Sequence, residues 1–221
     1  MGEIPGDLDR LAQWMDREGL GSGPIANPTL LAGGSQNILI RFTRSRRDYV
    51  LRRPPLHMRP ESNETMRREA RLLGALAQTP VPHALLIAAC LDESVLGAVF
   101  YLMTPIEGFN PQNGLPETHH SPAAQHRMGF ALVEGLAALH RVDPTAVGLS
   151  DFGKVDGFLE RQVARWQRQL AGYGDLASWP GAAALGDVDA VAGWLEANRP
   201  AHFRPGILHG DYHLANVMYR N

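Results

Sequence analysis

Apolar and polar positions in the first half of the chain recur at two different spacings, which predict a small sheet with helices beside it. Four short apolar runs predict strands: Ile38–Phe42, Tyr49–Arg52, Leu85–Leu91 and Ala98–Met103. The first two are joined by a charged turn and read as a hairpin. Two stretches with helical spacing predict helices: Leu8–Glu18 and Glu64–Gln78.

The pattern becomes helical after a candidate hinge at Thr104–Gly108. Three stretches predict helices: 123–140, 158–170 and 188–195. Ser121 and Pro122 precede the first of these and suit its N-cap and first turn. We therefore predict an α+β fold with two lobes. Residues 1–104 form an N-terminal antiparallel sheet plus helix, and residues 105–221 form a mostly helical C-terminal lobe.

Composition places few further limits on the function. The 221 residues are 44% hydrophobic and 20% charged, with a formal net charge of −2, so no global field favours nucleic acid or an anionic membrane as a partner. No stretch approaches the roughly 20 apolar residues that span a bilayer, and no signal-peptide core opens the chain. We expect a cytoplasmic protein. The lone Cys90 lies in an apolar run and is expected to be a buried small hydrophobe.

The strongest chemical signal is the polar loop His209–Val217, between the short strand-like runs Ile207–Leu208 and Val217–Tyr219. Asp211 and Asn216, five residues apart, can point into one cleft. The carboxylate can accept a proton from a substrate hydroxyl, and the amide can coordinate magnesium on a nucleotide.

The same loop permits a rival interpretation. In an extended strand, alternate side chains share a face, so His209, Asp211 and His213 could together bind zinc or iron as in a metallohydrolase. Gly210 argues against this because it favours a turn, and Asn216 would have no role.

A second candidate lies in the N-terminal half. Glu69 falls on the apolar stripe of its helix, and no cation stands three or four residues away. Strand alternation puts Arg52 on the face opposite Leu51 and Arg53. An Arg52–Glu69 pair would present a cation to a nucleotide phosphate. Alternatively, Glu69 lies at the edge of the stripe and is solvated.

Two further motifs carry weaker signals. Gly34, Ser35 and Asn37, just before the first strand of the hairpin, could bring backbone N–H groups and polar side chains to a phosphate, although glycines here also suit a plain turn. The triplet at 151–153 matches the D-F-G of protein kinases, but it precedes the polar loop instead of following it. We interpret it as an ordinary loop.

In this order the elements resemble the aminoglycoside phosphotransferase family, which has a protein-kinase-like fold. The H-G-D-x-x-x-x-N loop at 209–216 is the most specific match. Other segments resemble a subgroup associated with acyl-CoA dehydrogenases, free-standing or fused: Val50–Pro55, Arg68–Glu69, Leu139–His140, Phe158–Gln162 and Trp166.

The resemblance implies ATP and Mg²⁺ as cofactors and a role for each matching residue. Asp211 would be the catalytic base, Asn216 a magnesium ligand, and His213 a contact to the transferred phosphate. Arg52 would replace the usual phosphate-binding lysine, oriented by Glu69. The backbone of the linker residues would bind adenine: Met103, Thr104 and Ile106.

The resulting expectation is an ATP-dependent phosphotransferase acting on a hydroxyl of a small molecule, with a hydroxylated acyl compound as one candidate and an acyl-CoA dehydrogenase as a candidate partner. Family members continue into a second strand whose aspartate binds magnesium, so we expect the chain to be truncated and inactive alone. Two alternatives remain: a nucleotide-binding pseudokinase or interaction module, and the His/Asp metallohydrolase.

Overall fold

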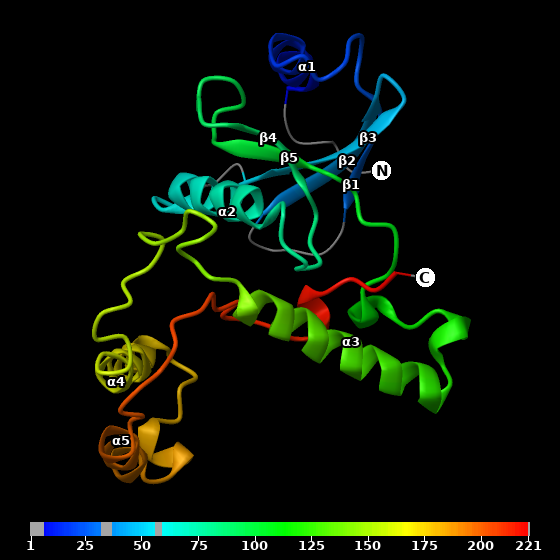
Figure 1. Cartoon of the computed structure of the whole chain (residues 1–221). Helices are drawn as coiled ribbons and strands as arrows, with labels where there is room; N and C mark the ends of the chain where they lie inside the picture. The colour runs from blue at the N-terminus through cyan, green and yellow to red at the C-terminus, as the bar shows by residue number, and fades with distance from the viewer. Residues whose placement is uncertain (1–6, 32–36, 56–58, 221) are drawn as a thin grey trace. The chain divides into compact units, whose positions relative to one another are not determined.

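The computed structural model describes residues 7–31, 37–55 and 59–220 (Figure 1). By their contacts the residues form two units, one of residues 1–143 and 207–221, the other of residues 144–206. The boundary predicted between residues 104 and 105 lies inside the first unit and stays a prediction. Within the described ranges, no helix is long and apolar enough to cross a membrane.

An antiparallel sheet forms the N-terminal part of the first unit. Its strands are β1 (Ala26–Leu31), β2 (Ile38–Arg44), β3 (Arg47–Arg53), β4 (Leu86–Cys90) and β5 (Phe100–Met103), in the spatial order β1-β2-β3-β5-β4. The predicted hairpin and the two later strands are confirmed. Strand β1 was not predicted because it contains Asn27 and Pro28, which are rare in central strands. It lies at the edge of the sheet, where proline is tolerated, and its pairing is irregular at this point.

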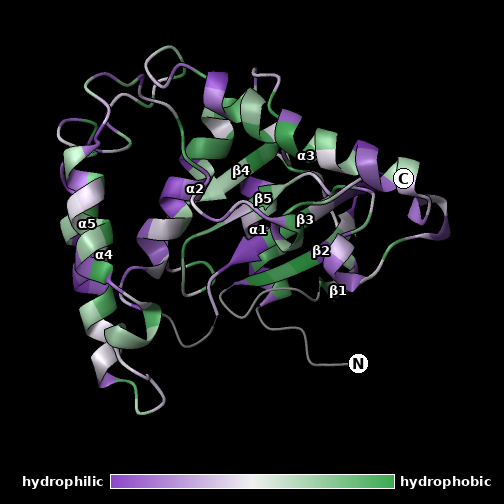
Figure 2. Cartoon of the chain, turned by 90° about the horizontal axis from the view of Figure 1, so that it is seen from below, coloured by the Kyte–Doolittle hydropathy of each residue, from purple (hydrophilic) through white to green (hydrophobic). Residues whose placement is uncertain are grey.

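The two faces of the sheet are covered by different helices (Figure 1). Helix α1 (Leu8–Arg17) buries Leu11, Trp14 and Met15 against one face, where Trp14 meets Phe100 edge to face at 4.9 Å. Helix α2 (Ser62–Leu76) packs Met66 and Ala70 on the other face. Figure 2 shows the hydrophobic residues gathered in the strands between them. Cys90 is buried in the α1 cluster, as predicted.

Strand register decides which residues meet on the α2 face. Arg52 of β3 is paired with Leu39 of β2 on one side and with Tyr101 of β5 on the other. Leu51, its neighbour in sequence, belongs to the cluster under α1. The period-2 alternation predicted for this strand therefore holds, and it turns Arg52 toward α2.

After β5 the chain runs through the short helices η1 (Pro111–Asn113) and η2 (Glu117–His119) into α3 (Pro122–Arg141). The hydroxyl of Ser121 accepts a hydrogen bond from the backbone N–H of Ala124 at 3.2 Å, which confirms the predicted cap of α3.

The C-terminal segment differs from expectation. Ile207–Leu208 and Val217–Met218 form no strand, so the strand-like runs predicted on both sides of the polar loop are wrong. The loop holds the one-turn helix η5 (Leu214–Asn216), and Tyr219 makes an isolated antiparallel bridge with Phe109. The two apolar runs do not pair with each other, and the bridge runs instead to the linker that follows β5.

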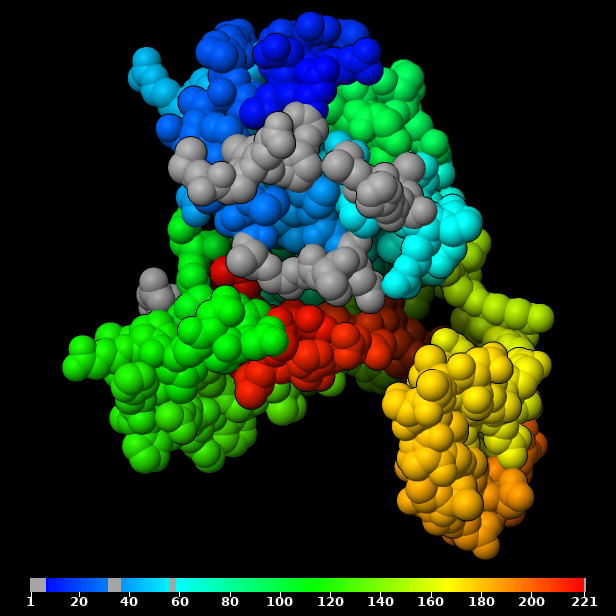
Figure 3. Space-filling model, turned by 180° about the vertical axis from the view of Figure 1, so that it is seen from behind, coloured from blue at the N-terminus to red at the C-terminus, as the bar shows by residue number. Residues whose placement is uncertain are grey.

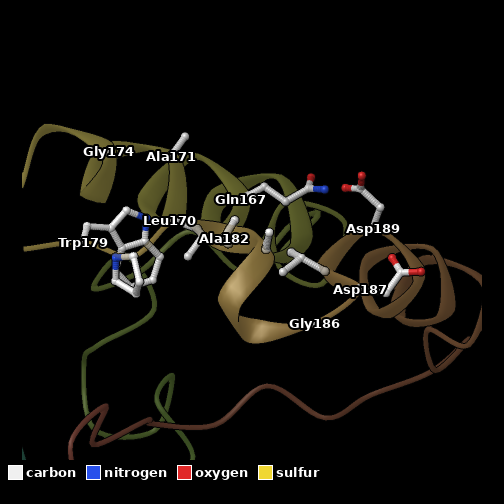
Figure 4. Close-up of a pocket in the computed structure, with 13 residues that line it drawn as sticks. Gln167, Leu170, Ala171, Gly174, Trp179, Ala182, Gly186, Asp187 and Asp189 are labelled. Carbon is white, nitrogen blue, oxygen red and sulfur yellow. The ribbon is translucent and has the colours of Figure 1, made fainter.

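The second unit contains α4 (Gln162–Gly172), η3 (Tyr173–Asp175), η4 (Ala182–Leu185) and α5 (Val188–Ala197). The predicted helix near Phe158 starts later than expected, at Gln162, because the preceding residues form turns. Side chains of the second unit line an open groove of about 780 Å³, with Leu170 and Trp179 at one side and Asp187 and Asp189 at the other (Figure 4). A second hollow, of about 720 Å³, lies in the first unit between α1 and β4.

Candidate functional site

Arg52 and Glu69 form a two-pronged ion pair on the α2 face of the sheet. Arg52 Nε donates to Glu69 Oε2 at 2.8 Å and Arg52 Nη2 donates to Glu69 Oε1 at 3.0 Å. The two side chains are 26% and 29% exposed, so the pair is largely shielded from water but open on one side. Of the two readings left open by the sequence, the pair is confirmed and the solvated Glu69 is wrong.

Tyr101 completes this cluster. Its hydroxyl donates to Glu69 Oε2 at 3.0 Å. Burial is the main reason that the pKa of Tyr101 lies well above its ordinary value. Burial also has the largest effect on the pKa of Arg52, which it lowers, but the hydrogen bonds to Glu69 and the neighbouring charges outweigh it, so the pKa is raised. The cluster therefore holds a permanently charged guanidinium at fixed geometry.

Tyr101 was not predicted from the sequence as part of the site. The alternation within Phe100–Met103 is the one sequence feature that could have indicated Tyr101. It does not show that Tyr101 lies beside Arg52, because only the register between β3 and β5 makes them neighbours.

The polar loop brings Asp211, His213 and Asn216 together. Asn216 Nδ2 donates to Asp211 Oδ2 at 2.8 Å and to the backbone carbonyl of Asp211 at 2.9 Å. His213 Nε2 lies 3.4 Å from Asp211 Oδ1 and 3.2 Å from Asn216 Nδ2. Gly210 has a φ of 84°, which confirms the predicted turn. Asp211 and Asn216 are both exposed to solvent.

The orientation of Asn216 follows from its partners. Two oxygens of Asp211 face the nitrogen of the amide, so exchanging the nitrogen and oxygen positions would set acceptor against acceptor. The amide oxygen is thereby turned away from Asp211. An amide oxygen is a hard donor of the kind that magnesium accepts, so Asn216 fits as one ligand of that ion.

Two tyrosines anchor the loop to α3. Tyr212 donates its hydroxyl hydrogen to the carbonyl of Leu132 at 2.7 Å, and Tyr219 does the same to the carbonyl of Met128 at 2.9 Å. These carbonyls lie four residues apart, one turn of the helix. No sequence signal marked either contact, because both depend on how α3 lies beside the loop.

The structure does not assemble the alternative metal site. Among the described residues, no group of three or more His, Cys, Asp or Glu side chains is arranged to hold a metal ion. His209 Nδ1 accepts the backbone N–H of Asp211 at 3.4 Å instead of turning toward His213. The arrangement therefore does not support the zinc or iron interpretation of this loop.

Of the remaining predicted residues, those that the structure describes lie in or near the first unit's sheet. Met103 ends β5, and the backbone N–H of Thr104 donates to Leu85 at 2.9 Å, while Ile106 follows in the half-buried linker. Asn37 directly precedes β2. Gly34 and Ser35 lie outside the described residues.

Comparison with known proteins agrees with this fold. Residues 28–221 match the phosphotransferase enzyme family. The chain is 32% identical over 195 residues to acyl-CoA dehydrogenase family member 11 of Gallus gallus, covering 85% of the chain and 23% of that protein. It is 30% identical over 174 residues to family member 10 of Mus musculus, covering 78% and 15%. The chain thus spans less than a quarter of either relative.

Solved structures show the same architecture. A protein of Ralstonia eutropha JMP134 assigned as an aminoglycoside phosphotransferase is 32% identical, with a TM-score of 0.75 over 97% of this chain and 61% of that one. Aminoglycoside phosphotransferase APH(4)-Ia, in a ternary complex with AMP-PNP and hygromycin B, is 15% identical with a TM-score of 0.58 over 96% and 67%, which shows the fold alone. The α+β, kinase-like fold is confirmed, and the chain belongs to the phosphotransferase enzyme family.

Proposed function

We propose that this protein transfers the γ-phosphate of ATP to a hydroxyl group of a small molecule. The observation that carries the proposal is the polar loop, in which Asn216 donates two hydrogen bonds to Asp211 while both side chains remain exposed to solvent. Membership of the phosphotransferase family and the nucleotide bound by APH(4)-Ia in its solved complex support it.

The N-terminal cluster would bind the nucleotide. Arg52, held by Glu69 and Tyr101, would place its charge against the α- and β-phosphates, as the lysine–glutamate pair does in related kinases. Gly34, Ser35 and Asn37 would cover the phosphates. The backbone of Met103–Ile106 would meet adenine, and since the N–H of Thr104 already bonds Leu85, other groups of this segment would do so.

The loop would handle the acceptor. Asp211 would orient the acceptor hydroxyl and take its proton, and His213, beside Asp211, would contact the transferred phosphate. Asn216 would hold Mg²⁺ through its amide oxygen. When bound, magnesium neutralises charge that develops on the phosphate oxygens.

The acceptor is proposed from the relatives. Both compared relatives are named as acyl-CoA dehydrogenase family members, which favours a hydroxylated acyl compound as substrate and an acyl-CoA dehydrogenase domain as partner. An aminoglycoside is the other class to consider, because hygromycin B is bound by the solved relative.

The test uses a version of the protein extended beyond residue 221, because the 221 residues alone are expected to be inactive. It measures transfer of labelled phosphate from ATP to a panel of hydroxyacyl-CoA esters, hydroxy fatty acids and hygromycin B. Asp211→Asn should reduce transfer by about 10²–10⁴-fold and leave ATP affinity nearly unchanged. Asp151→Asn, which alters the kinase-like triplet outside the loop, is the control and should transfer normally. Full transfer by Asp211→Asn would refute the proposed base. ATP binding without transfer to any acceptor would instead favour a nucleotide-binding module.

A further inference from the structure

One side chain of the linker after β5 reaches the backbone of the polar loop. Asn110 Nδ2 donates to the carbonyl oxygens of Ala215 at 2.7 Å and Val217 at 3.1 Å. These are the residues on either side of Asn216. Asn110 Oδ1 accepts the backbone N–H of Gln112 at 2.8 Å, which caps η1.

The amide of Asn110 is therefore fully defined. Rotating it by half a turn would set its oxygen against two carbonyl oxygens, so only the observed orientation is stable. Asn110 is half-buried, and replacing its bonds by water is correspondingly costly.

Because Asn110 binds the carbonyls of Ala215 and Val217, it fixes the backbone around Asn216. The peptide planes before and after a Cα determine the direction of its side chain. The backbone N–H of Asn216 also donates to the backbone carbonyl of His213 at 2.9 Å. The side chain of Asn216 is exposed, so its direction is set by this backbone and by its bonds to Asp211.

Neighbouring residues hold the same contact. Phe109 and Tyr219 exchange both backbone hydrogen bonds at 2.9 Å. In Figure 3 the linker segment (green) lies directly beside the C-terminal segment (red). Asn110 thus extends a short backbone pairing into the loop.

We propose that Asn110 is a positioning residue for the magnesium site: it sets the orientation of Asn216 and, through it, that of Asp211. This inference rests on the proposed function. Asn110 would act without touching the nucleotide or the acceptor. A change at this linker residue should therefore alter the affinity for magnesium.

The experiment uses the same extended version of the protein, in which the magnesium-binding strand expected after residue 221 is present. It measures the affinity of AMP-PNP by calorimetry with and without Mg²⁺, for the wild type, Asn110→Ala and Asn110→Asp. Residues that orient metal ligands typically contribute about 10–100-fold to metal affinity. We expect the factor by which Mg²⁺ raises the affinity for AMP-PNP to fall about tenfold in Asn110→Ala. It should fall at least as much in Asn110→Asp, whose carboxylate repels both carbonyls. Affinity without Mg²⁺ should stay within about twofold, because the Arg52 cluster is untouched.

Asn113→Asp is the matched control. It makes the same chemical change on an exposed residue of η1 and should leave both affinities unchanged. Thermal unfolding of each variant reports whether it is folded.

Each result decides the matter. Magnesium-dependent binding retained in full by Asn110→Ala would overturn the positioning role alone. Loss of affinity with and without Mg²⁺ to the same degree would show a purely structural role and would also overturn it. A wild type whose AMP-PNP affinity does not respond to Mg²⁺ would overturn the proposed function as well.

Discussion

We propose that Arg52 takes the role that lysine has in related kinases, and the change from lysine to arginine has physical consequences. A lysine offers a point charge, whereas a guanidinium presents a planar fork that matches the two oxygens of a carboxylate. Arg52 makes both hydrogen bonds to Glu69. The Tyr101 hydroxyl donates to Glu69 Oε2, which also accepts from Arg52 Nε. Removing one partner of this shielded pair leaves the other without compensation, so the two should act as one unit.

We therefore expect Arg52→Ala and Glu69→Ala each to weaken AMP-PNP binding, and the double variant to lose much less than the sum, with a coupling of about 1–3 kcal/mol. Calorimetry over the four proteins of the cycle measures this. The exposed pair of Arg67 and Glu93, also formed by α2 and 2.9 Å long, supplies the control cycle and should not affect affinity. Strictly additive losses at Arg52 and Glu69 would disprove the clamp.

Some of these residues could be predicted and others could not. Arg52 and Glu69 followed from the periods of one strand and one helix, which are local properties of the sequence. Asp211 and Asn216 followed from a motif. Asn110 was not predictable, because its two bonds join residues about a hundred positions apart and leave no periodic trace.

At the scale of elements, the linker and the C-terminal segment form a bridge that requires glycine at one position. A Cβ on Gly108 would lie 2.8 Å from the carbonyl carbon of Tyr219 and closer still to its oxygen. Neither atom can move without opening the bridge between Phe109 and Tyr219.

Gly108→Ala should therefore lower the free energy of unfolding by about 1–3 kcal/mol, the usual range for overpacking. Urea denaturation measures it. Gly129→Ala in α3 is the control, because a Cβ there meets nothing within 4 Å and alanine favours helix, so its stability should be unchanged or raised. Wild-type stability for Gly108→Ala would contradict the bridge.

The β2–β3 hairpin contains a carboxylate whose pKa is shifted. Asp48 accepts hydrogen bonds from Arg41 at 2.7 Å and from the hydroxyl of Thr43 at 2.7 Å, and these bonds, that from Arg41 foremost, hold its pKa below the ordinary value. A carboxyl group with a lowered folded-state pKa stabilises the fold above its unfolded-state pKa, and the contribution is lost as the pH falls through the folded-state pKa.

Asp48→Asn should thus be less stable than the wild type at pH 7, and the difference should shrink as the pH falls below about 4. Thermal unfolding between pH 7 and pH 3 tests this. Thr43→Val removes one of the two bonds and should show a smaller difference of the same sign. A difference that grows toward acid pH would contradict the assignment.

The prediction of strands failed where pairing with other parts of the chain decides whether a strand forms. Strand β1 forms although Asn27 and Pro28 stand in it, because an edge strand leaves one side unpaired. Conversely, the apolar runs around the polar loop form no strand, because they do not pair with each other. The edge position of β1 accounts for the first error, and the distant partner of Tyr219, Phe109, accounts for the second. Local pattern reveals neither.

For the whole molecule, the α+β class and the helical second half could be predicted because long periodic stretches dominate them. The grouping of residues 207–221 with the N-terminal half could not, because it depends on contacts of Tyr212, Tyr219 and Asn110 with segments far away in sequence.

We propose that the Arg52 cluster, the linker and the polar loop together form one nucleotide site in the first unit. Hydrogen–deuterium exchange with and without Mg²⁺ and AMP-PNP tests it most directly. We expect slower exchange in β3, in residues 103–110 and in residues 209–217 together, with no change around the groove lined by Trp179 and Asp187. Protection confined to that groove, or protection of β3 without the loop, would contradict it.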